Sequence, residues 1–206
     1  MLEQKPYATL DSLSFDASRY HYQGDADGKR TWLTPAGDGI GVLYFPTRPG
    51  LPAQVHSIAE LEQFYQERVC NDDVRMSEFN LVTADGIRCI WMILKVSLKP
   101  TGMVYLGSLT LPFAQFSYVI KMQCIERGVA GLRETMLLLK AQQDGSVTIG
   151  EDGNITGAWN PDDAIHDAEF PDHPLSRLRA EFTHIVTSLQ VGEAIKNEAR
   201  FDLAGV

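Results

Sequence analysis

The sequence is poor in the features that mark several protein classes. It has three cysteines, Cys70, Cys89 and Cys124, and their odd number and irregular spacing argue against a disulfide framework or a thiolate zinc site. No apolar run is long enough to span a bilayer, and the N-terminal MLEQKPYATLDSL lacks the apolar core of a signal peptide. We therefore expect a cytoplasmic protein that does not bind membranes.

Basic side chains are also scarce. The 206 residues include 18 lysines and arginines against 27 acidic residues, which gives a net charge of −9 and a pI of about 5.0. Nucleic acids and anionic membrane surfaces are bound through clustered positive charge, so neither is expected as a partner. Hydrophobic residues make up 44% of the chain, which suits a single domain over 1–206 with a substantial core.

Catalytic and metal-binding signatures are missing as well. The chain has no GxSxG motif, no clear cysteine–histidine set, no EF-hand spacing and no HExxH. The sequence therefore nominates no catalytic residue, no cofactor and no metal ligand.

Strand signals fill the middle of the chain. GIGVLYFP at 39–46 is a short β-rich run, whereas residues 1–38 are polar and are expected to form an irregular N-terminal segment. Asp85 and Gly86 have the composition of a two-residue hairpin turn between apolar runs. Consecutive strands with short links predict a four-stranded antiparallel meander, at 79–84, 87–97, 103–113 and 116–126.

Three segments show helical periodicity. Ser57 and Glu60 have capping-box spacing at the start of the first, which ends near residue 70. A second helix is expected after Val129. An acidic loop region at 144–173 precedes a C-terminal helix at 174–195. Amphipathic helices that cover a sheet with apolar residues on both faces predict an α+β fold, an antiparallel meander in an α/β/α sandwich.

This layout resembles the PsbP-like sandwich family, which includes bacterial effector-associated proteins. The resemblance covers roughly residues 40–190 and rests on SIAELEQFYQERV, then ADGIRCIWMI and PTGMVYLGSLTL in the meander, then a helix after the last strand. The family has no universal catalytic residues, and several of its branches bind other proteins. The resemblance therefore implies protein binding.

The stretch ERGVAGLRETML, residues 126–137, holds two acids, two arginines and two glycines within twelve positions. Its GVAG has the GxxG spacing that clamps nucleic-acid backbones in one RNA-binding module, but that role needs a basic surround. Charged side chains here are candidate binding residues: Glu126, Arg127, Arg133 and Glu134.

We interpret the same stretch as a joint between a strand and a helix. Gly128 is expected to turn the chain out of the fourth strand, and Gly131 to let the helix approach the sheet closely. Glu126 and Arg133 are expected to pair across the joint.

Two further groups are weighed as sites. The segment 151–173 holds seven acids and no lysine or arginine, and helical spacing would place oxygen and nitrogen ligands of Asp162, Asp163, His166 and Asp167 on shared faces. Charge runs are usually solvated, so we expect no metal there. His173 and Arg177 begin the last helix and are candidate binding residues for an anion, although pairing of Arg177 or Arg179 with the preceding acids explains them better.

The apolar sheet suggests a binding surface. Met and aromatic side chains adapt to partner helices, and some of these residues are expected to line a groove while most pack in the core: Trp91, Met92, Met103, Tyr105, Tyr118 and Met122. The sequence favours a non-enzymatic protein-binding module of the adaptor, chaperone or immunity type. A small-molecule carrier and a metal-dependent enzyme using the acidic loop remain alternatives, and a homodimer remains open.

Overall fold

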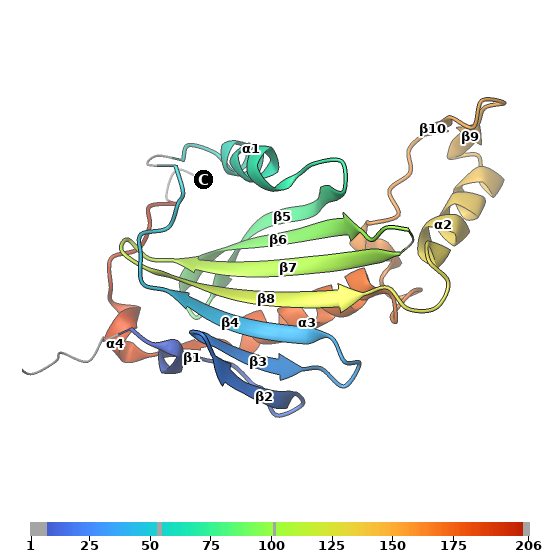
Figure 1. Cartoon of the computed structure of the whole chain (residues 1–206). Coiled ribbons are helices and arrows are strands. Elements are labelled where there is room, and N and C mark those ends of the chain that lie inside the picture. Colours follow the sequence, from blue (N-terminus) through green and yellow to red (C-terminus); the bar gives the residue numbers. More distant parts are fainter. Residues whose placement is uncertain (1–7, 53–54, 101, 204–206) are drawn as a thin grey trace, which may run out of the picture.

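A seven-stranded antiparallel sheet forms the centre of the protein (Figure 1). The computed structural model describes residues 8–52, 55–100 and 102–203. The sheet confirms the predicted α+β class. In spatial order its strands are β2 (His21–Ala26), β3 (Lys29–Leu33), β4 (Gly39–Phe45), β8 (Ser117–Ile125), β7 (Met103–Pro112), β6 (Ile87–Ser97) and β5 (Val74–Ala84).

The predicted meander is confirmed as β5 to β8, each strand paired antiparallel with the next. Asp85 and Gly86 form the tight turn between β5 and β6, with φ of 44° and 73°. Both residues lie in the left-handed region, which a hairpin turn of this type requires.

The prediction of an irregular N-terminal segment at 1–38 is wrong for residues 21–33, whose extended segments and turn are ordered into two strands, while residues 1–7 lie outside the described residues. β2 and β3 form a hairpin that extends the sheet beside β4, and Asp27 and Gly28 turn it with φ of 51° and 69°. Most side chains of β2 are exposed. A strand that buries so little carries no apolar alternation, and the sequence therefore gives no periodic signal for it.

Helices cover the two faces of the sheet unequally (Figure 1). α3 (Pro174–Ser188) packs against β7, β8 and β5, and its Leu178, Phe182 and Ile185 are fully buried. α1 (Ile58–Val69) packs on the opposite face, where its main contact is with the edge strand β5. Ser57 caps α1 through the amide of Glu60, at 3.1 Å.

The C-terminal helix is shorter than the predicted 174–195. It ends at Ser188, because Leu189 has extended backbone angles. β11 (Gln190–Val191) then pairs with β1 (Leu13–Ser14), which follows the short helix η1 (Leu10–Ser12). A final short helix follows Gly192, α4 (Glu193–Lys196).

α2 (Leu132–Gln143) and the segment after it project from one end of the sheet (Figure 1). The predicted acidic loop region is partly ordered into the hairpin β9 (Val147–Ile149) and β10 (Ile155–Gly157) and the short helix η2 (Ala164–His166). No helix within the described ranges is long and apolar enough to cross a membrane.

Candidate functional site

Alternate residues of each strand face opposite sides of the sheet. On β7, Tyr105 and Leu109 face α3 and are fully buried, while Leu106 and Ser108 face the other way and are partly exposed. We call the side under α3 the covered face and the other side the open face. α1 occupies only the β5 side of the open face.

A groove of about 600 Å³ lies on the open face. Two glycines of β4 form part of its floor. A Cβ on Gly39 would meet no atom within 4 Å, and one on Gly41 would touch only the side chains of Lys29 and Thr31. Apolar side chains of neighbouring strands line the remainder, among them Leu33, Leu43, Met92, Leu94 and Leu106.

Two lysines give the groove a positive charge. Lys29 and Lys121 line it together with neutral polar side chains, and none of its described lining residues is acidic. Within the described part of the chain neither lysine forms an ion pair. Each of the other four described lysines does form one: Lys95 with Glu134 and Asp162, Lys99 with Asp73, Lys140 with Glu169, and Lys196 with Asp85. In a chain of net charge −9, this groove is a local site of uncompensated positive charge.

The groove is long and shallow. Its lining residues come from six adjacent strands, from β2 to β6, and from Val69 at the end of α1. Five steps between strands of about 4.8 Å make roughly 24 Å across the sheet. That is the length of a helix of about 16 residues.

The sheet residues expected to line a groove are divided between the faces. Met92 does line the groove. Met122 borders its floor, but the Met122 side chain is buried in the core beneath α3, and Met103 packs against that core. The three aromatic residues Trp91, Tyr105 and Tyr118 instead belong to the buried core beneath α3. Lys29, Lys121 and Gly39 are not singled out by the sequence. The lysines stand out only by having no ion-pair partner among the described residues, and Gly39 only by the empty space above it.

A second polar cluster lies at the end of the sheet where β8 stops and α2 begins. The structure brings together Glu126 after β8, Glu134 in the first turn of α2 and His173 at the N-cap of α3. Glu134 accepts a 2.6 Å hydrogen bond from Lys95. Burial, followed by the nearby Arg133 charge, lowers the pKa of His173 to about 4, so its ring is neutral at physiological pH.

Arg133 is the buried centre of this end of the molecule. Its side chain is fully buried and donates to Asp167 and Ser176, at 2.9 and 2.8 Å, and to the carbonyls of Pro161 and Asp163. The expected pair with Glu126 is wrong. Arg133 instead ties α2 to the acidic segment and to α3.

Glu126 holds the joint differently from the prediction. Its Oε1 accepts a 2.7 Å hydrogen bond from the amide of Gly131. Gly131 does not approach the sheet, because a Cβ there would meet no atom within 4 Å. Its φ of 71°, like the 80° of Gly128, shows that both glycines serve backbone turns.

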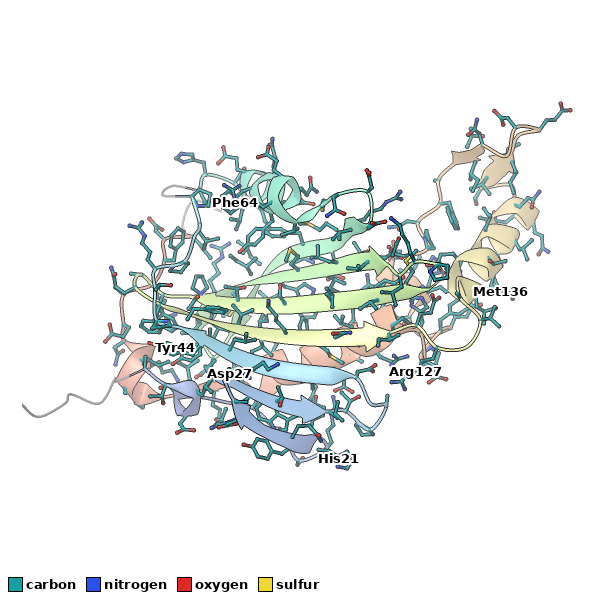
Figure 2. The ribbon with its side chains drawn as sticks, in the orientation of Figure 1. His21, Asp27, Tyr44, Phe64, Arg127 and Met136 are labelled. Atoms are coloured by element: carbon teal, nitrogen blue, oxygen red, sulfur yellow. The ribbon has the colours of Figure 1, made fainter. Side chains whose placement is uncertain are left out.

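The remaining candidates, Arg127 and Arg177, meet at a buried carboxylate. Arg177 binds Asp38 through two hydrogen bonds of 2.8 and 3.0 Å, and Arg127 lies 3.7 Å from the same side chain. Figure 2 shows Arg127 at the end of the sheet from which α2 projects. Arg177 also donates to the carbonyl of Asp172. These contacts fix α3 to the loop before β4, which is a structural role.

The acidic segment uses its carboxylates in similar contacts. Asp167 binds Arg133 and Arg179, and Asp162 binds Lys95 and Ser77. The interpretation that Arg179 pairs with a preceding acid is therefore confirmed.

Comparison with known proteins gives little guidance. No protein-family model matches the chain, and no curated protein does. A solved structure from Bacteroides thetaiotaomicron is similar at 10% identity and a TM-score of 0.39, covering 78% of this chain and 50% of that one. This chain thus spans half the length of that protein.

A second solved structure is LpqN, involved in cell envelope biogenesis of Mycobacterium tuberculosis. It is similar at 12% identity and a TM-score of 0.32, over 64% of this chain and 78% of LpqN. Likeness at this level carries no argument about function, so the function is argued from the site.

Proposed function

We propose that this chain is a non-enzymatic binding module whose open-face groove takes an acidic, amphipathic helix of a partner protein. The observation that carries the proposal is the pair of lysines, Lys29 and Lys121, which lie unpaired in an apolar groove with no acidic lining residue. An apolar surface with uncompensated positive charge is complementary to an apolar surface that carries carboxylates.

The shape of the groove supports a helix as the occupant. An amphipathic helix binds by laying its apolar face into a hydrophobic groove. A groove that crosses six strands offers the length for about four turns of helix. The helix would complete the second helical layer, which α1 supplies only toward the β5 side of the open face. The resemblance to the PsbP-like family, which implies the same class of function, stays a prediction.

A display library of amphipathic 16-residue peptides tests the proposal. Peptides selected on the wild-type chain are expected to carry Asp or Glu beside their apolar face. Lys29→Glu and Lys121→Glu should each weaken the selected peptides about tenfold, because an attraction becomes a repulsion. Lys140→Glu is the matched control, since Lys140 lies on α2 outside the groove.

The salt dependence provides a second measure. Affinity should fall as ionic strength rises, since exposed charges are screened. Selected peptides without acidic residues, or peptides that bind Lys121→Glu as tightly as wild type, would contradict the proposal.

An acidic, apolar small molecule is the second candidate, because the groove volume of about 600 Å³ lies within the range of small-molecule sites. Titration with a fluorescent long-chain fatty acid separates the two. Saturable fatty-acid binding that Lys121→Glu abolishes, without any selected acidic peptide, would favour the carrier.

A further inference from the structure

Three metal-ligand side chains converge at the end of the covered face. Glu126, Glu134 and His173 each offer one ligand atom, and the three atoms lie within 4.8 Å of one another. They come from three different elements, since Glu126 follows β8, Glu134 belongs to α2 and His173 caps α3. This site is separate from the open-face groove.

Each of the three side chains has one buried atom without a partner. Within the described part of the chain, Glu126 Oε2, Glu134 Oε2 and His173 Nε2 are buried and make no hydrogen bond. Buried polar atoms are nearly always paired, and leaving them unpaired is costly. Three such atoms in one small cluster indicate a ligand that binds all of them.

The other polar atoms of the same side chains are held in place. Glu126 Oε1 accepts from the Gly131 amide at 2.7 Å, and Glu134 Oε1 accepts from Lys95 Nζ at 2.6 Å. His173 Nδ1 accepts from the amide of Leu175 at 3.3 Å, and its ring packs edge-on against Tyr105. The contacts of the two glutamates fix their free oxygens in position, as supporting hydrogen bonds do for metal ligands. The contact of His173 fixes the orientation of its ring, with Nδ1 as the acceptor and the ring proton on Nε2.

The chemistry of the donors selects the class of ion. Two carboxylates and one neutral imidazole form a donor set for a cation. Imidazole suits zinc and similar transition metals, whereas Ca²⁺ and Mg²⁺ prefer six or more oxygen ligands.

A hollow of about 250 Å³ at the surface is lined by Glu126 and His173, together with Arg127, Glu169 and Asp172. The hollow adjoins the cluster and has space for water, while Glu134 lies behind it and the three unpaired atoms are buried.

We propose that Glu126, Glu134 and His173 form a binding site for one divalent transition-metal ion of the zinc class, with water from the hollow completing its coordination. Two ligand atoms at about 2.1 Å from a tetrahedral zinc ion lie roughly 3.4 Å apart, so ligand atoms that lie within 4.8 Å of one another have to move closer when the ion binds. Metal on Nε2 places the ring proton on Nδ1. The bond from the Leu175 amide is then lost, which couples the ion to the first turn of α3.

Calorimetric titration of the chelator-treated full chain with ZnCl₂ tests the site. A Cys70→Ser background removes the one cysteine that is only partly buried. We expect one zinc ion per chain, with much weaker Ca²⁺ and Mg²⁺ binding. Glu126→Gln, Glu134→Gln and His173→Asn should each weaken zinc binding about tenfold or more. Asn keeps an N-capping side chain at position 173.

Glu169→Gln is the matched control, because Glu169 lines the same hollow but lies outside the ligand set. It should bind zinc as the wild type does. The amide resonance of Leu175 should shift when zinc binds to the wild type and stay in place in His173→Asn. Thermal unfolding in chelator verifies that each variant is folded. The proposal is overturned if the wild type binds no zinc, if all three ligand variants bind as tightly as wild type, or if Glu169→Gln loses binding equally.

Discussion

The covered and open faces of the sheet differ most clearly at two glycines. A Cβ on Gly107 would lie 2.6 Å from Cε2 of Phe182 in α3, whereas a Cβ on Gly39 would meet no atom within 4 Å. On the covered face the missing side chain lets a helix approach the strand. On the open face it leaves a hollow. A glycine in a strand therefore marks either the closest packing or an empty space, and only its surroundings decide which.

The largest effect on the free energy of unfolding is expected at Arg133, the buried charged residue at the end of the covered face. Arg133→Met should lower the free energy of unfolding by about 3–5 kcal/mol, because Asp167 and two carbonyls lose a fully buried donor. Arg127→Met is the control, since Arg127 is half exposed and 3.7 Å from its nearest carboxylate. It should change stability by less than about 1 kcal/mol. Urea unfolding measures both, and equal effects would refute a special role for Arg133.

The next effect depends on pH and on His173. Burial lowers the pKa of His173 from its ordinary 6.5 to about 4, so the unfolded chain takes up this proton at higher pH than the folded chain. The contribution to stability is complete above about pH 6.5 and is lost as the pH falls toward 4. With chelator present, the wild type should lose on the order of 3 kcal/mol more than His173→Asn over this interval. Parallel pH profiles would refute the low pKa.

A smaller effect compares the two faces directly. Gly107→Ala should cost about 1–3 kcal/mol, because its new methyl group forces Phe182 and Leu178 to move. Gly39→Ala should stay within about 0.5 kcal/mol of wild type. Guanidinium unfolding of both variants measures the difference between their free energies of unfolding. Equal values for Gly107→Ala and Gly39→Ala would show that α3 moves without cost or that the open face is packed as closely as the covered face.

The sequence predicts those parts of the fold that carry a periodic apolar pattern. The helices α1 and α3 and the strand β8 are predicted by apolar residues that repeat at three to four or at two residues. The strand β6 is predicted by a continuous apolar run that follows the Asp85–Gly86 turn. The β2–β3 hairpin was missed because β2 buries almost nothing. The end of α3 was misplaced because the apolar residues Leu189 and Val191 follow it while the backbone there is extended.

The candidate sites depend on contacts between distant residues. The sequence singled out Glu126, Glu134 and His173 by their chemistry, but their convergence depends on how α2 and α3 pack. The sequence interpretation paired Arg133 with Glu126 at the same joint, whereas its partner Asp167 lies 34 residues away. Lys29 and Lys121 stand out only once the other described lysines are seen to be paired.

The central claim is that the open face binds a partner while the covered face maintains the fold. Gly39→Leu tests it most directly, because a larger side chain at this position fills the groove without a clash at its Cβ. We predict that a selected acidic peptide binds Gly39→Leu about tenfold more weakly than wild type, a loss of about 1.4 kcal/mol, at an unchanged free energy of unfolding. Unchanged peptide affinity, or a loss of stability as large as that of Gly107→Ala, would contradict the account.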